Sequence, residues 1–395
     1  MLRPSIRLHL PAIPHTITHD DFSHCAFTGK VLRFSPMMRS KGFEVYHYGI
    51  ESSESGADKQ IDLMTRKEWQ DLRVFSYKEL HPDKTDAEVE ELLSSEKSFV
   101  GDLANVSTML YTVFNKRFRE ELQKHYRAKH TDIVCIPFGK AYQEALQGLS
   151  VVEVETGIGY PDSYAPYRIF ESYAQMHFIC GKENINQPFN YWFVVPNYYN
   201  IKEWSFNQIV EKPRVGFFGR ICHIKGLNVF VEVAKRFPEV EFVMCGQGDE
   251  QPYMDKAPNL NYLKPLSGKD RCAFLSSLSA LICPSLYIEP FCGVNVEAQL
   301  CGTPVICNHF GAFSETVEHG KTGLWCHTLA DFCHGVQMAL NNEFDRKYIR
   351  DRAVKKYDMF QVASQYEYAF RCVLDLFTYK NGWYSEDDHI AKTFL

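Results

Sequence analysis

Residues 214–226 read RVGFFGRICHIKG, a short apolar run that ends in glycine and leads into a stretch with helical spacing. The same unit recurs along most of the chain. Short apolar runs that alternate with amphipathic segments are typical of a parallel sheet covered by helices on both faces, so the sequence predicts an α/β fold. The apolar runs are SIRLHLPAI (5–13), FEVYHYGI (43–50), DIVCIPFG (132–139), SVVEVE (150–155), RVGFFG (214–219), VEFVMCG (240–246), LNYLKPL (260–266), ALICPSL (280–286) and TPVICN (303–308).

This series of runs starts twice. Between its two parts, residues 197–213 are rich in Pro, Asn and charged side chains, which is typical of a boundary between domains. The length of 395 residues also favours two cores over one. We expect two Rossmann-like, doubly wound domains, 1–199 and 200–375, that face each other across a cleft, with a polar tail at 376–395 folding back on the first. Ligands of such sheets bind outside the carboxyl ends of the strands.

The composition excludes several classes of function. A formal net charge of −6 and the lack of an extended Lys/Arg block disfavour nucleic-acid binding. Thirteen cysteines form no CxxC pair and lie mostly in apolar runs, so we expect reduced, buried thiols in a cytoplasmic protein. A zinc site at Cys301, Cys307 and His309 is a weaker alternative, because its spacing matches no familiar ligand pattern.

The basic segment 115–130 has two interpretations. Lysines and arginines alternate there with glutamates, which is typical of a solvated helix face. The alternative is a weak peripheral contact with an anionic membrane surface. No apolar stretch reaches the length of a membrane-spanning helix.

Polar residues that suit a diphosphate follow the apolar runs of the second half. Arg220 and Lys225 come directly after RVGFFG, where a fork of N–H donors and a mobile ammonium both suit phosphate oxygens. Gly246 and Gly248 end the next run, where they would allow a ligand to approach the backbone or would only serve a turn. Leu266 ends the following run, at a place where backbone groups would form hydrogen bonds with the edge of a nucleotide base.

The stretch EPFCGVNVEAQLCGTPVI (289–306) carries two glutamates. Gly293 and Val294 are expected in the first turn of a helix, whose unpaired N–H groups suit an anion. If the whole interval were helical, Glu289 and Glu297 would lie about 12 Å apart, beyond the roughly 5 to 9.5 Å between glycosidase carboxylates. The spacing therefore favours two ends of one ligand, with Glu297 accepting from ribose hydroxyls and Glu289 from those of a hexose.

These motifs together resemble the retaining glycosyltransferases of family four, which have the two-domain GT-B fold. The resemblance rests on GRICHIKG (219–226), CGQGDE (245–250), the stretch at 289–306 and NHFGAFSETVEHGKTGLWC (308–326). It implies that Arg220 and Lys225 hold the donor's diphosphate, without a metal ion, and that Glu289 holds the donor sugar. The implied donor-binding residues are Glu297, Gly219, Gly246, Gly248, Leu266, Phe291, Cys292, Gly293 and Val294.

The first half departs from this family. Its members open with a glycine-rich loop after the first strand, whereas this chain has only Gly29 and Lys30, so we expect the first domain's contact with the ligand there. Glu155, Tyr160 and Arg168 are expected on the acceptor side of the cleft, because aromatic rings stack on sugars and Arg pairs with acidic groups. The alternative for these three residues is a tight turn with packed aromatic side chains.

The sequence therefore predicts a retaining, metal-independent glycosyltransferase. Its donor would be a UDP- or GDP-sugar, with the base undetermined, and its acceptor a glycan, a lipid-linked sugar or another glycoconjugate. Two alternatives stay open on the same fold. One is a nucleotide-sugar epimerase or sugar-phosphate synthase, and the other is a non-catalytic subunit that binds a sugar nucleotide.

Overall fold

The structure is a computed structural model that describes residues 5–23, 25–93, 100–188 and 191–378. The chain forms two compact units. The first comprises the described residues of Met1–Phe170, Lys182–Val195 and Val362–Leu395, and the second comprises Glu171–Gly181 and Pro196–Gln361. The expected domain bounds, 1–199 and 200–375, stay a prediction. Most of the tail expected at 376–395 lies outside the described residues.

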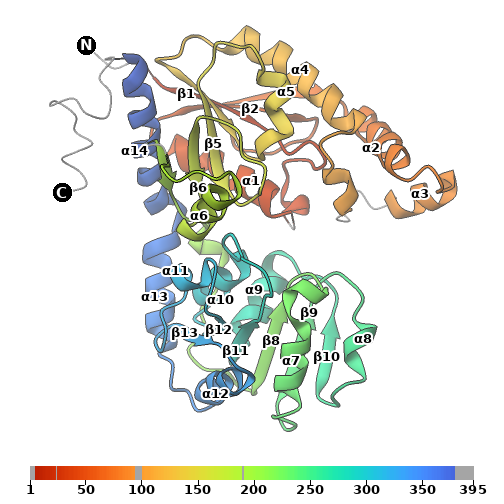
Figure 1. The fold of residues 1–395 in the computed structure, drawn as a ribbon, viewed down its shortest axis with the longest axis vertical. Coiled ribbons are helices and arrows are strands. Elements are labelled where there is room, and N and C mark those ends of the chain that lie inside the picture. Colours follow the sequence, from red (N-terminus) through yellow and green to blue (C-terminus); the bar gives the residue numbers. More distant parts are fainter. Residues whose placement is uncertain (1–4, 24, 94–99, 189–190, 379–395) are drawn as a thin grey trace. The chain divides into compact units, whose positions relative to one another are not determined.

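The first unit contains a seven-stranded sheet in the order β3-β2-β1-β4-β5-β6-β7 (Figure 1). Every neighbouring pair is parallel. The chain builds outward from β1 through β2 to β3 and then returns to add β4 on the other side of β1, so the strand order reverses between β1 and β4. The strands are β1 Arg7–Pro11, β2 Glu44–Ile50, β3 Lys59–Met64, β4 Asp132–Ile136, β5 Glu153–Ile158, β6 Tyr167–Phe170 and β7 Trp192–Val194.

Helices cover this sheet. Thr65 begins α2 with a capping box, because its hydroxyl accepts from the N–H of Glu68 while the Glu68 carboxylate accepts from the N–H of Thr65. A core cluster packs Trp69 of α2 and Phe114 and Phe118 of α4 against inward-facing strand residues. The helices are α1 Ala26–Arg39, α2 Arg66–Leu80, α3 Asp86–Leu93, α4 Met109–His125 and α5 Gln143–Leu146.

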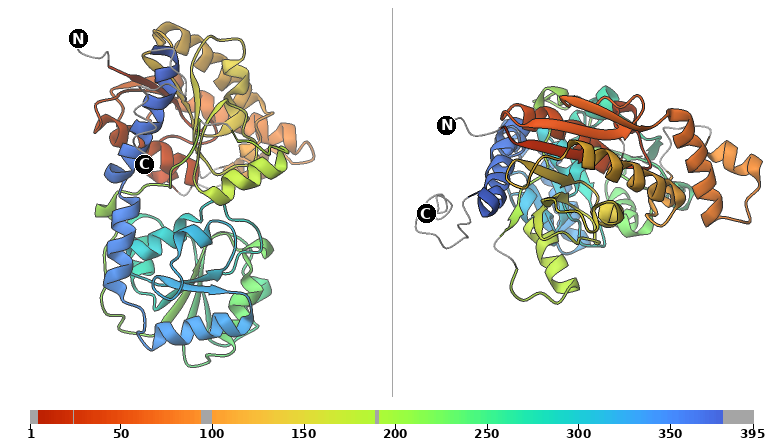
Figure 2. Two further views of the ribbon diagram at one scale, coloured as in Figure 1. Left: turned by 60° about the vertical axis from the view of Figure 1, so that its left-hand side comes forward. Right: turned by 90° about the horizontal axis from the view of Figure 1, so that it is seen from above.

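The last described helix is α14 (Met359–Thr378), which is long and amphipathic (Figure 2). Residues from Val362 onward belong to the first unit. There the ring of Tyr366 packs edge-on against Phe34 of α1, with ring centroids 5.6 Å apart. None of the helices in the described residues is long and apolar enough to cross a membrane.

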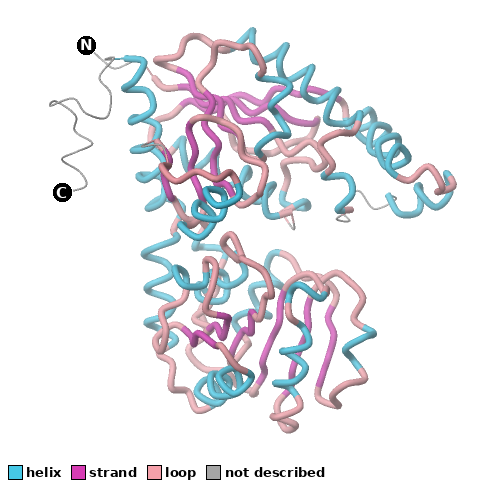
Figure 3. Tube along the Cα trace, in the orientation of Figure 1, coloured by secondary structure: helices cyan, strands magenta, loops and turns pink. Residues whose placement is uncertain are grey.

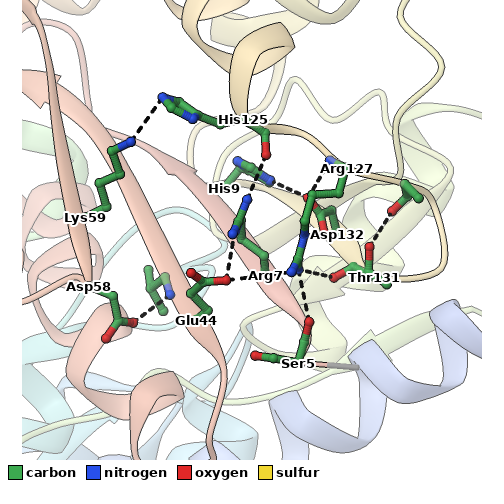
Figure 4. Close-up of polar contacts among 12 residues, drawn as sticks. Ser5, Arg7, His9, Glu44, Asp58, Lys59, His125, Arg127, Thr131 and Asp132 are labelled. Atoms are coloured by element: carbon green, nitrogen blue, oxygen red, sulfur yellow. Dashed lines mark hydrogen bonds and ion pairs between the residues drawn. The ribbon is translucent and has the colours of Figure 1, made fainter. Parts of the chain in front are cut away.

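A buried polar network joins the amino ends of β1 and β4 (Figure 4). His9 Nε2 lies 3.0 Å from Oδ2 of Asp132, and its Nδ1 lies 2.7 Å from the hydroxyl of Tyr48. Arg127 donates to Oδ1 of Asp132 at 2.8 Å. Burial lowers the pKa of His9 although Asp132 lies beside it. The charged members of this network, Asp132 and Arg127, lie at and before the start of β4, opposite the carboxyl ends of the strands, so we assign the network to stability.

The second unit contains a six-stranded parallel sheet in the order β10-β9-β8-β11-β12-β13 (Figure 3). Its strand order reverses between β8 and β11. The strands are β8 Arg214–Phe218, β9 Glu241–Cys245, β10 Leu260–Leu263, β11 Ala280–Cys283, β12 Val305–Asn308 and β13 Gly323–Cys326. The helices are α6 Tyr173–Lys182, α7 Leu227–Ala234, α8 Gln251–Met254, α9 Gly268–Ser276, α10 Gly293–Leu300, α11 Phe313–Thr316, α12 Leu329–Leu340 and α13 Arg346–Tyr357.

Alternate residues of these strands enter two separate cores, so both faces of the sheet are buried. In β9, Phe242 and Met244 pack with α7 and α12, whereas Val243 and Cys245 pack with α9 and α10. Cysteines of β9, β11 and β12 share the face under α9 and α10. They fill it as small apolar side chains, as the sequence predicts.

The predicted apolar runs coincide with nine of the strands. Sequence reasoning missed β3, β6, β7 and β13, which are short or alternate polar with apolar residues; β3, β7 and β13 are edge strands.

Candidate functional site

Lys225 and Glu289 meet at the point where the strand order of the second unit reverses. Lys225 ends the short turn that follows β8, and Glu289 lies in the loop between β11 and α10. The two loops are joined by a hydrogen bond from the N–H of Leu286 to the carbonyl of Ile224, at 2.8 Å. A reversal of strand order leaves a crevice outside the carboxyl ends of the strands, which is where ligands of doubly wound sheets bind.

Lys225 and Glu289 form a largely buried ion pair. The side chain of Lys225 is 17% exposed and that of Glu289 is 4% exposed, and Lys225 Nζ lies 2.6 Å from Glu289 Oε1. Oε1 also accepts from the hydroxyl of Ser285 at 2.6 Å, and Oε2 accepts from that of Tyr287 at 2.7 Å. Burial opposes the charge of Lys225, but the Glu289 carboxylate outweighs it, so the pKa of Lys225 lies above its ordinary value.

Both partners of the pair keep unused hydrogen-bonding capacity. An ammonium has three N–H donors; Lys225 uses one on Glu289 and one on Tyr287, at 2.8 Å. A carboxylate offers about four acceptor positions, of which Glu289 has filled three. One donor and one acceptor are therefore left for a ligand. Sequence reasoning missed Ser285 and Tyr287, although both lie within four residues of Glu289.

Gly226 fixes the place of Lys225. Its φ is +74°, in the left-handed region that favours glycine, and a Cβ atom there would lie 1.9 Å from the carbonyl oxygen of Pro284. The backbone after Lys225 thus packs directly on the end of β11.

Arg220 follows β8 in the same loop. It is exposed, and among the described residues no hydrogen bond or ion pair joins its side chain to another group. It is therefore available to an anion, as the sequence predicts, but the structure holds it less firmly than Lys225.

Helix α10 begins at Gly293 without a side-chain cap. Its N-cap residue, Cys292, has a φ of +63°, a strained conformation for a residue other than glycine that is found most often at functional sites. The first N–H groups of a helix have no partner within the helix, so this turn can bind an anion. A contact with Cys283 and burial raise the pKa of the Cys292 thiol well above its ordinary value, which disfavours the thiolate form that a nucleophile needs.

Glu297 lies on α10 and pairs with Arg271 of α9. The Glu297 side chain is 10% exposed and that of Arg271 is 23% exposed. Sequence reasoning missed Arg271, because nothing in the run of residues shows that α9 packs beside α10. The only signal was a basic residue next to the buried positions Cys272, Phe274 and Leu275.

The glycines of the CGQG stretch serve the packing of two loops. A Cβ atom on Gly246 would lie 1.7 Å from the carbonyl oxygen of Gly219, and one on Gly248 would lie 2.3 Å from that of Ile221. The N–H of Gly219 donates to Cys245 and that of Ile221 to Gln247. The two predicted roles were close approach of a ligand and a turn, and these contacts favour the turn. The glycines allow the loop after β9 to pack against the loop that carries Arg220.

The remaining predicted donor residues face the core with their side chains. Phe291 is buried and packs edge-on against Tyr357, with ring centroids 5.9 Å apart. Val294 and Leu266 pack partly buried against the core under α9 and α10. Only their backbone groups are placed to bind a ligand.

In the first unit, Glu155 is buried and its carboxylate is bound by the loop that follows β5. Its Oε1 accepts from the N–H groups of Tyr164 and Ala165, each at 2.6 Å, and its Oε2 accepts from the hydroxyl of Tyr160 at 2.9 Å. Arg168 donates to the carbonyl of Ala165 and pairs with Glu183 at 3.0 Å. These contacts favour the packed turn over the predicted acceptor contact for Glu155, Tyr160 and Arg168.

Gly29 and Lys30 lie inside α1 and not in a loop. The N–H of Gly29 donates to the carbonyl of Cys25 at 2.9 Å, so it is not available to a phosphate. Lys30 is buried and donates to the carbonyl of Gly157 at 2.7 Å. Sequence reasoning expected these two residues to replace the family's glycine-rich loop. It overlooked that the helix already begins at Ala26, before the glycine.

Other predicted features can be placed in the same way. In the part of the chain that the structure describes, no three His, Cys, Asp or Glu side chains are arranged to hold a metal ion. His309 stacks on Trp325, whereas Cys301 and Cys307 lie in the core, so the zinc alternative gains no support. In the basic segment, Arg117 pairs with Glu68 and Lys124 with Glu121 on the exposed side of α4, which favours the solvated helix face over the membrane contact.

Comparisons with known proteins agree with this arrangement. Residues 200–356 match the family described as Glycosyl transferases group 1. An alpha-maltose-1-phosphate synthase of Mycolicibacterium smegmatis is 32% identical over 133 residues, 30% of this chain and 34% of that protein. The matched segment spans about a third to a half of the length of such curated relatives.

Solved structures match over nearly the whole chain. A sucrose-phosphate synthase from Thermosynechococcus elongatus superimposes with a TM-score of 0.67 at 15% identity, over 94% of this chain and 99% of that one. The Anabaena protein HepE, in complex with UDP-glucose, gives a TM-score of 0.60 at 14% identity over 93% and 99%. Two parallel sheets with these matches confirm the predicted GT-B fold. Through residues 200–356, the chain is thus similar to the group 1 glycosyl transferases.

Proposed function

We propose that the chain is a retaining glycosyltransferase that moves a sugar from a nucleotide-sugar donor to a carbohydrate or glycoconjugate acceptor. One observation carries the proposal: at the reversal of strand order in the second unit, a buried carboxylate, Glu289, is held by side chains and paired with Lys225. The start of α10 and the exposed Arg220 adjoin the same loops.

The cationic groups would stabilise the leaving diphosphate. Negative charge grows on it as the bond to the sugar breaks, and donors that are already in place lower the barrier without reorganising. The third N–H of Lys225, the guanidinium of Arg220 and the first N–H groups of α10 supply such donors. These groups would stabilise the negative charge that a divalent cation stabilises in other transferases, so the proposed reaction needs no metal.

The two glutamates would bind the sugars at either end of the donor. Glu289 has one acceptor position left for a hydroxyl of the transferred sugar, next to the ammonium that faces the diphosphate. Glu297 accepts from Arg271 through Oε2, which leaves Oε1 for the ribose hydroxyls. An ionised carboxylate is the strongest acceptor a protein offers to paired hydroxyls.

Retention is proposed from the resemblance to family four, and no protein nucleophile is assigned. Cys292 is the nearest thiol, and its raised pKa keeps it protonated. A relative and a structural neighbour are both named as sugar-phosphate synthases, which supports a phosphorylated sugar as a second candidate acceptor. None of the thirteen cysteines, which all lie in the described residues, forms a disulfide, and this supports a reducing, cytoplasmic compartment.

The test is donor turnover in the presence of EDTA. UDP-glucose, GDP-mannose and related donors are incubated with glucose, glucose phosphates and glycan acceptors, and the release of nucleoside diphosphate is measured. The proposal expects release that needs an acceptor and yields an α-linked product from an α-linked donor. Release without transfer, or an interconverted donor sugar, would favour the epimerase. Binding without any turnover across donors and acceptors would favour the non-catalytic subunit.

A further inference from the structure

Arg271 is placed to control the carboxylate of Glu297. It extends from α9 to α10, and its Nη2 contacts Glu297 Oε2. The guanidinium lies 4.8 Å from the ring centroid of Phe218, the last residue of β8. A salt bridge on one side and an aromatic face on the other fix its position.

The pair is largely shielded from water. At 10% exposure, Glu297 has lost most of its hydration, and a buried charge that loses its partner is strongly unfavourable. Arg271 Nε is itself buried and has no hydrogen-bond partner in the described part of the chain. The contact with Glu297 is therefore the main polar interaction that holds this guanidinium.

The pair uses one oxygen of Glu297 and leaves the other. Among the described residues, Arg271 is the only group with a hydrogen bond to this carboxylate. A Cβ atom built on Gly293 would lie 3.8 Å from Glu297 Oε1, so the second oxygen lies beside the first turn of α10. The geometry thus turns Oε1 toward the end of the helix that adjoins the Glu289 loop.

We propose that Arg271 is a positioning residue, which holds Oε2 of Glu297 so that Oε1 accepts from the ribose hydroxyls of the donor nucleotide. This inference rests on the proposed function. Arg271 would act through Glu297 and would not itself touch the substrate. Removing Arg271 should therefore weaken recognition of the ribose specifically, whereas a merely structural ion pair would affect all ligands alike.

The experiment compares UDP with 2′-deoxy-UDP by calorimetric titration, with GDP and 2′-deoxy-GDP as the pair where guanine binds more tightly. A hydrogen bond to a charged group contributes about 1.5 kcal/mol or more, so the wild-type protein should bind the deoxy nucleotide roughly tenfold more weakly. In Arg271→Leu, the affinity for UDP should fall about tenfold while that for 2′-deoxy-UDP changes less than about twofold, so that the ratio approaches one.

Two further variants test whether Arg271 and Glu297 act together on the ribose. Glu297→Gln should lose the discrimination as Arg271→Leu does, and the double variant should lose nothing further, because residues that act as a unit are not additive. Lys269→Leu is the matched control, since Lys269 is an exposed basic residue on the same helix, and it should keep the wild-type ratio. If Arg271→Leu does not fold, Arg271→Gln is measured with the same expectation.

The outcomes separate the inference from the proposed function. A folded Arg271 variant that keeps the wild-type ratio overturns the positioning role while the proposed function stands. A wild-type protein that binds the ribose and deoxyribose nucleotides equally overturns the ribose contact of Glu297 and the inference with it. A wild-type protein that binds neither UDP nor GDP overturns the proposed function itself.

Discussion

Each unit of this protein holds a buried glutamate, Glu155 within β5 of the first and Glu289 after β11 of the second, but the two are bound in different ways. Glu155 in the first unit accepts from two backbone N–H groups and one tyrosine hydroxyl of its own loop. Glu289 in the second unit accepts only from side chains, those of Lys225, Ser285 and Tyr287.

The difference supports the proposal that Glu155 is a structural carboxylate and Glu289 a functional one. Backbone donors cannot leave without unfolding the loop, so Glu155 is committed to the turn that it stabilises. Side-chain donors can reorient, and Lys225 carries a further N–H that a ligand can use. The comparison assigns stability to the first site and chemistry to the second, and four predictions test it.

The largest effect is expected on stability at Glu155. Glu155→Ala leaves two backbone N–H groups and the Tyr160 hydroxyl buried without an acceptor, which should lower the free energy of unfolding by about 3 kcal/mol. Urea denaturation measures it. Glu155→Gln is the control, since its carbonyl oxygen still accepts from both N–H groups and should cost much less. Lost activity in a fully folded Glu155→Ala protein would restore the acceptor role.

At Lys225 the effect should appear in catalysis. Lys225→Ala removes the N–H donor proposed to bind the leaving diphosphate and should lower kcat/KM for the donor about a hundredfold, or about 2.7 kcal/mol of transition-state stabilisation. Steady-state kinetics on folded protein check this. Lys235→Ala, which removes an exposed lysine paired with Glu232 on α7, should change nothing. Equal kinetics in the two variants would argue against the donor site.

The first unit should also show a pH-dependent stability that originates in its interior. Burial lowers the pKa of His47 to about 4, whereas in the unfolded chain it is about 6.5. Between about pH 6.5 and about pH 4, His47 is protonated in the unfolded state but stays neutral in the folded state. The free energy of unfolding therefore decreases as the pH falls from about 6.5 toward about 4. From pH 7 to pH 5 the loss should be about 2 kcal/mol.

Denaturation of His47→Gln at both pH values provides the comparison. The variant lacks the titrating group. Its free energy of unfolding should therefore decrease between pH 7 and pH 5 by about 2 kcal/mol less than that of the wild type. His9, whose pKa is also lowered by burial, remains in both proteins and contributes equally. The same pH dependence in both would show that His47 is not responsible.

The smallest effect is expected at Arg220. Because its side chain is exposed, Arg220→Ala should leave the free energy of unfolding within about 0.5 kcal/mol of the wild type. Loss of one charge-assisted contact with the diphosphate should raise the donor KM about tenfold. Arg236→Ala, at another exposed arginine of this unit, should leave KM unchanged. A large loss of stability in Arg220→Ala would show a structural role.

Much of this arrangement could be predicted from the sequence, because local patterns encode it. Strands buried on both faces appear as continuous apolar runs, which is why RVGFFG and VEFVMCG were recognisable as β8 and β9. Edge strands have a weaker pattern of apolar residues, and sequence reasoning missed β3 and β13 for that reason. Glu289 and Lys225 could be proposed as site residues because each follows such a run, and the structure brings the two together.

Tertiary contacts account for what the sequence left out. Arg271 acts on Glu297 only because α9 packs beside α10, and no local pattern records that neighbour. Gly29 was expected in a loop, but the helical hydrogen bond to Cys25 places it inside α1. The glycines of CGQG were compatible with a ligand or with a turn, and only the approach of Gly246 to Gly219 decides between them.

Hydrogen–deuterium exchange with and without a nucleoside diphosphate tests the central claim most directly. The claim is that the donor binds at the carboxyl edge of the second sheet, between the loops after β8 and β11. Saturating UDP or GDP should slow exchange in peptides covering residues 219–226 and 289–297, and Lys225→Ala should weaken that protection. Protection confined to the first unit, or none at a concentration that stabilises the protein, would contradict the account.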